Sequence, residues 1–320
     1  MSKLLLIDGS NLCHRVFWAN RELSFEGSPV GAIYGFFKSL ISLRKKYPEH
    51  FMIIAWDSRS KRRMEESTKA VENGLIPFAY KENRKDRNEE ISEELESLFA
   101  QMDTIREGLK LVKILQVRMS GYEADDVIYT YVNQNKGNEN VVITSDKDYY
   151  QMLYANVKVI DAMKQETWTE ERFEMEYGFS PDKWVEVGSL CGDTSDGIHG
   201  IAGWGEKTAI KYIIKHGNRD NVIQAIKEES ERLDSEYATK VAKAEEKGKK
   251  PPKKKELKKK EQCLLDSLEI IELANSLKQM DIVPFVPRIR LVDSYDHKNL
   301  EEYFLKYNFG SLLKDVRFLV

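Results

Sequence analysis

Closely spaced carboxylates are the first feature of this sequence that suggests chemistry. In the stretch SGYEADDVIYT, residues 120–130, Glu123, Asp125 and Asp126 fall within four positions and an apolar run follows them. Like charges at this density raise one another's pKa values, so the cluster does not stabilise a fold unless a positive charge lies nearby. The stretch therefore predicts a bound cation.

Further aspartates follow short apolar segments elsewhere in the chain. The segment KLLLID ends in Asp8, FMIIAWD ends in Asp57, and NVVITSDKD supplies Asp146 and Asp148. Each segment is partly β-branched and bounded by polar residues, as is typical of a buried parallel strand. A single Asp at a strand end is more often a helix cap or a turn residue, but several such ends are harder to explain in that way.

The order of strands and helices would bring these aspartates together. Helical patterns at residues 33–41 and 91–109 separate the strands, which predicts an α/β fold with a mostly parallel central sheet flanked by helices. Ligands of such sheets bind beyond the carboxyl ends of the strands. Two aspartates of the later stretch CGDTSDGIHG join the group expected at this edge. The nine acidic residues are Asp8, Asp57, Glu123, Asp125, Asp126, Asp146, Asp148, Asp193 and Asp196.

The ligand type indicates which metal would bind. Oxygen ligands without paired His or Cys favour Mg²⁺ or Mn²⁺ over zinc. Two such ions close together are the usual apparatus for cleaving phosphodiesters, because one activates water and the other stabilises the leaving oxygen. The sequence thus predicts a phosphodiesterase with two divalent ions.

The composition excludes several other classes of protein. The 320-residue chain is 41% hydrophobic and 32% charged, with a net charge of −3. No apolar run approaches the ~20 residues that span a bilayer, and Asp8 interrupts the N-terminal run too early for a signal peptide. Three distant cysteines support neither a disulfide framework nor a cysteine-type zinc site. A reducing, cytoplasmic setting is expected, with no membrane partner.

The ordered motifs resemble those of the 5′-nuclease superfamily, which comprises flap endonucleases and 5′–3′ exonucleases. They are LLLIDGSN, AWD, YKENR, GYEADD, TSDKD and GDTSDGIHGIAGWGEKTA. The similarity is greatest with bacteriophage exonucleases and the 5′-nuclease domain of bacterial DNA polymerase I, and covers residues 3–215 strongly. It implies a PIN-like core in which the nine acidic residues carry or support the metals, with Asp8 and Asp57 counted as catalytic. It also implies hydrolysis at 5′ ends, 5′ flaps or RNA primers in replication or repair.

The glycine-rich stretch GIAGWGEKTAIKYIIKHG is interpreted as a helix–hairpin–helix. Glu206 stands where a P-loop requires Lys, and no apolar strand precedes the glycines. Gly203 and Gly205 would form the turn, and Lys207 would contact a backbone phosphate near the helix N-terminus. The resemblance implies a K⁺ ion held here by backbone carbonyls and a grip on the duplex part of the substrate. The alternative is a turn that only lets two helices pack closely.

The basic segment of residues 58–90 is longer than most connections in a compact fold. The resemblance implies a helical arch over the active site. Tyr80 would offer a base-stacking face, and Lys81 and Arg84 would bring positive charge to the scissile phosphate. If the arch is helical at this point, Lys81 and Arg84 share a face. For the outlying lysines, a solvated charged loop is the alternative.

Two regions are expected along the chain. Residues 1–185 would form the α/β nuclease core with the arch, and residues 186–320 the DNA-binding region with the helix–hairpin–helix. A Lys-rich insertion at about 228–262 is either a DNA contact or a solvated surface, since residues 240–260 contain eleven Lys and three Glu. The proline pair within it predicts two helices joined by a tip. NLEEYFLKYNFGSLLKDV predicts an amphipathic helix–turn–helix, and because no polymerase sequence follows, a free-standing monomer is expected.

The expected substrates are branched or flapped DNA and RNA–DNA hybrids, with a replication polymerase or single-strand-binding protein as a further partner. One alternative is a PIN-type ribonuclease, which shares the acidic α/β core but usually lacks the hairpin and the long basic arch. The other is a non-catalytic junction-binding protein, which would be expected to have lost several acidic ligands. Whether the protein prefers to act as an exonuclease or as an endonuclease is left open.

Overall fold

Two compact units make up the part of the chain that the structure describes. The computed structural model covers residues 3–83, 92–112, 114–154, 156–289 and 297–319. Unit 1 comprises Met1–Arg62, Lys85–Arg172 and Met280–Val320, and unit 2 comprises Arg63–Arg84 and Phe173–Gln279. These units differ from the consecutive regions expected from the sequence, because the chain returns to unit 1 after Gln279.

A six-stranded sheet of order β5-β4-β1-β6-β7-β8 forms the centre of unit 1. All neighbouring pairs are parallel except β7 and β8, which confirms the predicted α/β fold. A separate two-stranded ribbon joins β2 and β3. The strands are β1 (Leu4–Asp8), β2 (Ser24–Phe25), β3 (Ser28–Pro29), β4 (Phe51–Trp56), β5 (Leu115–Arg118), β6 (Asn140–Ile143), β7 (Val157–Asp161) and β8 (Glu166–Trp168).

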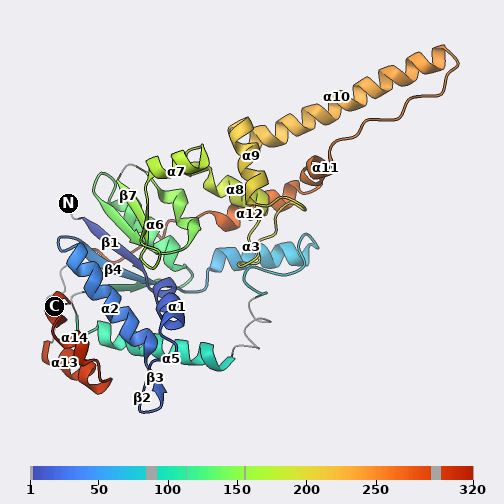
Figure 1. The fold of residues 1–320 in the computed structure, drawn as a ribbon. Helices are drawn as coiled ribbons and strands as arrows, with labels where there is room; N and C mark the ends of the chain where they lie inside the picture. Colours follow the sequence, from blue (N-terminus) through green and yellow to red (C-terminus); the bar gives the residue numbers. More distant parts are fainter. Residues whose placement is uncertain (1–2, 84–91, 113, 155, 290–296, 320) are drawn as a thin grey trace. The chain divides into compact units, whose positions relative to one another are not determined.

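Helices cover both faces of this sheet (Figure 1). On one face, Leu5, Ile7 and Ile54 pack in a large core cluster with apolar residues of α1, α2 and α5. Successive strand residues alternate between faces, so Leu4 and Leu6, also fully buried, face the side where α6 contacts β1 and β4. The elements of unit 1 are α1 (Gly9–Ala19), α2 (Gly31–Lys46), α5 (Ser92–Leu109), α6 (Ala124–Gln134), the 3-10 helix η1 (Lys147–Met152), α13 (His297–Lys306), α14 (Gly310–Leu313) and the 3-10 helix η3 (Val316–Phe318).

The C-terminal helices complete the core of unit 1. Phe304 of α13 packs edge-on against Phe37 of α2 with ring centroids 5.2 Å apart, and Phe309 belongs to the same cluster. Before them, the segment 281–287 runs along α6: the Val283 N–H donates to Thr130 Oγ1 at 2.8 Å, and the Tyr131 hydroxyl donates to the Pro287 carbonyl at 2.7 Å. The amphipathic helix–turn–helix predicted near the end of the chain is confirmed.

Unit 2 is helical. Arg63, which is 1% exposed, donates from Nε to the Leu277 carbonyl at 3.1 Å and so joins α3 to the end of α12. None of the helices in the described ranges is both long and apolar enough to cross a membrane. The elements are α3 (Lys61–Glu72), which begins just before the unit boundary, α7 (Glu170–Tyr177), the 3-10 helix η2 (Pro181–Lys183), α8 (Trp184–Cys191), α9 (Glu206–His216), α10 (Arg219–Glu246), α11 (Lys259–Leu265) and α12 (Leu268–Lys278).

Candidate metal and nucleic-acid sites

Strand β1 carries Asp8 to the carboxyl edge of the sheet in unit 1. Asp8 caps α1 through Oδ1, which accepts the Asn11 N–H at 2.9 Å, and its Oδ2 accepts the Tyr149 hydroxyl at 2.9 Å. Burial raises the pKa of Asp8 to about 7, and the charges of Asp57 and Asp125 add to the rise, whereas the hydrogen bonds from Asn11 and Tyr149 oppose it. A bound cation would stabilise the ionised form of such a carboxylate.

Tyr149 indicates which carboxylates lie near Asp8 at the carboxyl edge of the sheet. It is fully buried, and burial is the main reason why the pKa of its hydroxyl lies well above the ordinary value. Because Coulomb interactions weaken with distance, the charges that raise this pKa further must lie near the phenol. These charges belong to four predicted site residues, which in decreasing order of effect on the pKa are Asp8, Asp125, Asp146 and Asp57. The structure thus gathers carboxylates that follow β1, β4 and β6 or begin α6.

Short polar residues after β1 hold this edge together. The Asp57 N–H donates to Ser10 Oγ at 3.2 Å, and Asn11 Oδ1 accepts the Ser145 N–H at 3.1 Å and the Ser145 hydroxyl at 3.0 Å. Ser10, Asn11 and Tyr149 were not singled out in the sequence, although DGSN and DKDYY place them directly beside predicted aspartates. Their role is to orient the carboxylates and to join the ends of neighbouring strands.

The carboxylates at the start of α6 play different structural parts. Asp126 is 0% exposed, and its two oxygens accept the Glu123 N–H at 3.0 Å and the Asp281 N–H at 2.8 Å. Asp57 Oδ1 accepts the Ala124 N–H at 2.9 Å, which orients Asp57 against the same helix end. Because both oxygens of Asp126 hold backbone N–H groups, Asp126 suits a supporting part better than direct metal ligation.

The turn after β6 carries Asp146 and Asp148. Asp146 caps η1, and its Oδ1 accepts the Asp148 N–H at 2.8 Å. Asp146 is exposed and Asp148 is partly buried, so both carboxylates can be reached from solvent.

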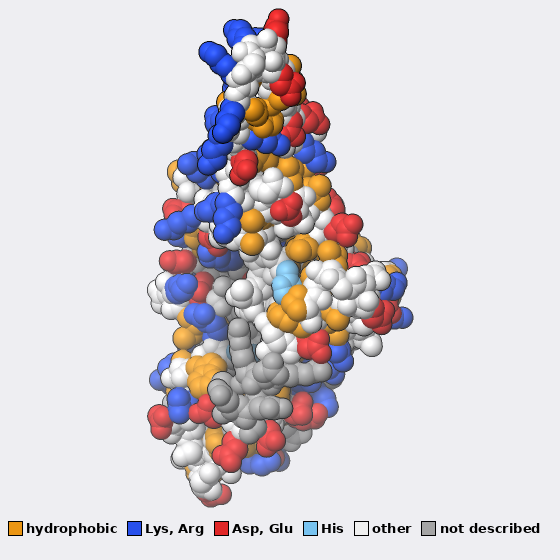
Figure 2. Space-filling view, turned by 90° about the vertical axis from the view of Figure 1, so that its right-hand side faces the viewer, with side chains coloured by type: hydrophobic (Ala, Val, Ile, Leu, Met, Phe, Trp, Pro, Cys, Tyr) orange, Lys and Arg blue, Asp and Glu red, His pale blue; other side chains and the backbone are white. Residues whose placement is uncertain are grey.

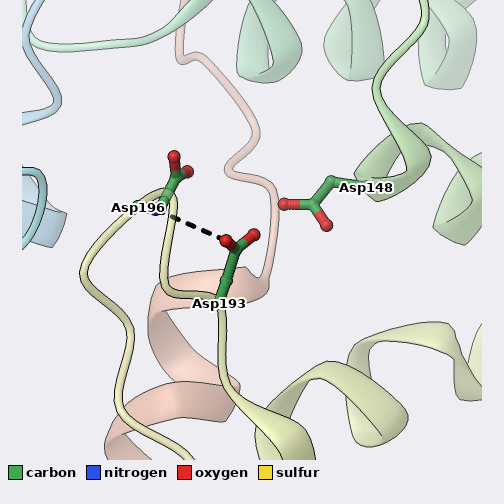
Figure 3. Close-up of side chains that lie close together, drawn as sticks. All are labelled: Asp148, Asp193 and Asp196. Carbon is green, nitrogen blue, oxygen red and sulfur yellow. Dashed lines mark hydrogen bonds between the residues drawn. The ribbon is translucent and has the colours of Figure 1, made fainter. Parts of the chain in front are cut away.

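Unit 2 contributes its own acidic loop after α8. Asp193 and Ile198 exchange two backbone hydrogen bonds of 2.8 Å, which close the loop. Asp193 Oδ1 accepts the Ser195 N–H at 2.8 Å and the Asp196 N–H at 3.4 Å (Figure 3, which also draws Asp148 of unit 1). Asp193 and Asp196 therefore lie on one rigid turn.

A buried lysine, Lys278, neutralises Asp193. Its Nζ donates to Asp193 Oδ2 at 2.6 Å, and the side chain of Lys278 is 7% exposed. Burial alone would raise the pKa of Asp193, but the charge of Lys278 and hydrogen bonds from Lys278 and Ser195 outweigh it and lower the pKa to about 2. The sequence showed no signal for this pairing, because a single Lys in the last turn of a helix is ordinary.

Lys278→Met is expected to lower the free energy of unfolding by about 2 kcal/mol, because it leaves the partly buried Asp193 carboxylate without its cation. Lys278→Met combined with Asp193→Asn should recover at least half of the loss, since no charge is then left unpaired. Urea unfolding of the four members of this cycle measures the effect. Equal stability of Lys278→Met and the parent would contradict the pairing.

The YKEN segment packs on the acidic loop within unit 2. Tyr80 is 4% exposed, packs with Ile198, Ala274 and Leu277, and its hydroxyl donates to Asp196 Oδ2 at 3.2 Å. This burial argues against the base-stacking role expected for Tyr80, because neither face of the ring is open to a base.

Lys81 of this segment is partly exposed. Its N–H donates to the Asp196 carbonyl at 2.7 Å, and its Nζ lies 3.9 Å from Asp196 Oδ2 and 4.8 Å from the ring centroid of Tyr80. Residues 80–83 form a turn in which Lys81 has a φ of 58°, so the helix that would align Lys81 with Arg84 does not extend here. Arg84 lies outside the described residues.

The glycine-rich stretch forms a turn between α8 and α9. Gly203 has a φ of 77°, in the left-handed region that favours glycine, and Gly205 caps α9. Gly203, Gly205 and Lys207 are exposed, whereas Trp204 is buried and donates from Nε1 to the Lys260 carbonyl at 2.9 Å. The arrangement leaves the start of α9 open to a phosphate.

Comparison with known proteins gives relatives for both parts of the chain. Residues 3–178 match the family described as 5′-3′ exonuclease, N-terminal resolvase-like domain, and residues 179–282 match 5′-3′ exonuclease, C-terminal SAM fold. A 5′-3′ exonuclease of Aquifex aeolicus is 34% identical over 227 residues, which is 70% of this chain and 73% of that protein. The thermostable DNA polymerase I of Thermus thermophilus is 31% identical over 225 residues, which is 69% of this chain but 25% of the polymerase.

Solved structures share the fold. The T5 5′-exonuclease with bound divalent metal ions (zinc) aligns with a TM-score of 0.65 and 21% identity over 86% of this chain and 89% of that chain. A bacteriophage T5 flap endonuclease in complex with DNA and metal ions aligns with a TM-score of 0.63 and 20% identity over 86% and 88%.

Proposed function

We propose that this protein hydrolyses phosphodiesters at the carboxyl edge of the unit 1 sheet. The chain belongs to the 5′–3′ exonuclease family and acts on DNA as a 5′–3′ exonuclease or flap endonuclease. The observation that carries this proposal is the meeting of Asp8 and Asp57 at the ends of the paired strands β1 and β4, where Asp8 Oδ2 accepts the Tyr149 hydroxyl at 2.9 Å and Asp57 Oδ1 accepts the N–H of Ala124, the first residue of α6, at 2.9 Å. Among the residues that the structure describes, no Lys or Arg forms an ion pair with Asp8 or Asp57. The site is therefore rich in hard oxygen ligands and fits Mg²⁺ or Mn²⁺.

The residues at this edge have different roles in the proposed reaction. Divalent ions held by these carboxylates, two in the expected arrangement, would activate water and stabilise the leaving oxygen. The Asn11 N–H and the Tyr149 hydroxyl fix the two oxygens of Asp8, and the Ala124 N–H fixes Asp57. Such fixed carboxylates need little reorganisation during the reaction, which is how preorganised sites stabilise a transition state. The remaining acidic residues proposed to hold or support the ions are Glu123, Asp125, Asp126, Asp146, Asp148, Asp193 and Asp196.

Unit 2 would bind the substrate. Lys81, whose ammonium group is partly exposed, is proposed to meet the scissile phosphate together with Arg84. Gly203, Gly205 and Lys207 would contact the duplex backbone at the start of α9. We also propose that a K⁺ ion binds at this turn and improves duplex binding more than Na⁺ does.

Cleavage of a labelled 5′-flap duplex tests the function directly. Cutting is expected in Mg²⁺ or Mn²⁺ and is expected to stop in EDTA, whereas a single-stranded RNA of equal length should be cut much more slowly. Preferred cutting of the RNA would favour a PIN-type ribonuclease, and binding of the flap without any cutting would favour a junction-binding protein. The substrates proposed for this function are 5′ ends, 5′ flaps and RNA primers. We further propose that the active form is a monomer in the cytoplasm of a bacterium or phage-infected cell. A polymerase or a single-strand-binding protein is its proposed partner.

Gly205→Val is expected to weaken duplex binding about tenfold and to lower the free energy of unfolding by less than about 1 kcal/mol, because valine is a poorer N-cap residue than glycine. A side chain at Gly205 meets nothing within 4 Å, and its φ of −103° suits valine, so packing is undisturbed while the approach of a phosphate is blocked. Fluorescence anisotropy with a flap duplex and a melting curve measure the two effects.

Gly203→Val provides the comparison, because its φ of 77° should also reduce stability by about 1–2 kcal/mol. Unchanged duplex affinity of Gly205→Val would contradict the role of this turn.

A further inference from the structure

A basic arm, residues 240–260, extends from unit 2 and has no part in the function described above. It consists of the end of α10, a turn, a return segment without helix or strand at residues 249–258, and the start of α11 (Figure 1). Helix α10 has 28 residues, so at 1.5 Å per residue it is about 42 Å long. The last seven residues of α10, about 10 Å long, belong to the arm, and this part of the arm can run beside about three base pairs of DNA at 3.4 Å per step.

Specific contacts hold the arm in this form. The turn contains Gly248, with a φ of 60°, and the Lys249 N–H donates to the Ala244 carbonyl at 2.8 Å. Lys254 then pairs with Asp234 of α10 at 2.7 Å, which fastens the return segment to the helix. The arm is thus a folded hairpin rather than a loose tail.

The base of the arm joins the glycine turn. The Lys260 carbonyl accepts the Trp204 indole N–H at 2.9 Å, and the Tyr212 hydroxyl donates to Glu261 Oε1 at 2.9 Å. A Cβ placed on Gly203 would lie 3.9 Å from the side chain of Lys260. The arm is therefore continuous with the surface proposed to hold the duplex.

Within the described ranges, the charges of the arm are not balanced by ion pairs. Of its eleven lysines, Lys240, Lys254 and Lys258 form ion pairs with Glu236, Asp234 and Glu261. Six other exposed lysines have no ion pair with any residue in the described ranges: Lys243, Lys247, Lys249, Lys250, Lys253 and Lys259. In the space-filling view, Lys and Arg side chains gather along one edge of the upper part, and Asp and Glu along the other (Figure 2). Runs of like charge repel and commonly serve as interaction segments for polyanions.

The side chains of the arm indicate which polyanion fits. Residues 238–258 contain no Phe, Tyr or Trp on which bases of a single strand could stack, and no Arg, Asn or Gln that could read base edges. Lysine is a flexible point charge that suits phosphates without reading sequence. The composition therefore favours the backbone of double-stranded DNA over a single strand.

We propose that the basic arm binds the sugar–phosphate backbone of the substrate's duplex and so extends the contact that begins at the glycine turn. This proposal rests on the proposed function, since it assumes that the duplex part of a cleavable substrate lies on unit 2. Its contribution is affinity and not chemistry, because the ion pairs of its lysines within the described residues are with Glu236, Asp234 and Glu261, none of which is named in the reaction.

Two variants with the same change in net charge test the arm. The first carries Lys249→Gln, Lys250→Gln and Lys253→Gln, which are exposed and have no ion pair with a described residue. The second carries Lys110→Gln, Lys164→Gln and Lys298→Gln, which are exposed lysines of unit 1 outside the arm. Affinity of the full-length protein for a 5′-flap substrate with a duplex of about 25 base pairs is measured in EDTA at several KCl concentrations. Each lost phosphate contact should reduce the slope of log affinity against log salt by about 0.9.

The first variant is expected to bind about tenfold more weakly, with the slope reduced by about 2 to 3, while the second changes the slope by less than 1. Single-stranded DNA should show a smaller difference between the variants. An equal effect in both variants, or none in either, would overturn the proposal. Because binding is measured without divalent ions, failure of the arm is distinguished from failure of the nuclease function. Failure of the nuclease function would appear as absent cleavage by the parent protein. The first variant should cleave at the parental single-turnover rate under saturating enzyme.

Discussion

Asp146→Asn together with Asp148→Asn is expected to abolish cleavage of a 5′-flap substrate, by at least about a thousandfold, while flap binding stays within about tenfold of the parent. Asparagine retains a side-chain oxygen that can accept the Asp148 N–H now bound by Asp146, so the cap of η1 is kept. What is lost is the negative charge that a divalent ion requires. Binding is expected to persist because the phosphate contacts proposed for the basic elements of unit 2 would supply most of the affinity.

Rapid-quench cleavage and anisotropy on the same substrate separate these two effects. Asp103→Asn together with Asp220→Asn provides a matched control, since both side chains are 79% exposed and the net charge changes equally. The control should retain parental activity. Undiminished turnover of the Asp146 and Asp148 variant in saturating Mg²⁺ would remove these residues from the mechanism.

Lys81→Ala is expected to reduce the single-turnover rate on the order of a hundredfold, with a smaller effect on binding. Phosphoryl transfer leaves negative charge on oxygens, and a cation placed there helps chiefly in the transition state. The side chain of Lys81 is 25% exposed and its Nζ lies 3.9 Å from Asp196 Oδ2, so its ammonium group is held in place without being enclosed. Lys81→Arg should restore part of the rate because it keeps the charge.

Lys254→Ala is the control for this second experiment. Lys254 also has a carboxylate partner, Asp234 at 2.7 Å, but it lies in the basic arm. We expect this variant to alter binding weakly and only at low salt, with no effect on the saturated rate. If both variants slowed the reaction equally, or if Lys81→Ala acted through affinity alone, Lys81 would be a tether and not a catalyst.

The strands and their terminal carboxylates could be predicted because they depend on local sequence. LLLID and FMIIAWD are apolar runs that end in Asp, and their parallel pairing places Asp8 beside Ala55, one residue short of Trp56 at the end of β4. The helical periodicity of residues 33–41 likewise predicted the buried face of α2, since Ile33, Phe36 and Leu40 are all in the core.

The partners of these carboxylates could not be predicted, because tertiary structure supplies them. Tyr149 reaches Asp8 across 141 residues of sequence, and Lys278 reaches Asp193 across 85. Neither residue type at either position is unusual by itself. Tyr80 shows the opposite difficulty: an aromatic residue in a basic segment suggested a stacking surface, yet apolar neighbours from α12 and the acidic loop bury it.

The hydrogen bond between Asp126 and residue 281 has a consequence for the order in which the protein is made. A ribosome synthesises α6 long before the segment that donates the Asp281 N–H to Asp126 and the Val283 N–H to Thr130. Phe304, which completes the core beside α2, emerges later still. Contacts between such distant parts of a chain form slowly and late in folding. A nascent chain would therefore carry all nine predicted site carboxylates without a finished active site, and would acquire the ability to cut nucleic acid only after the segment at residues 281–283 and Phe304 have emerged.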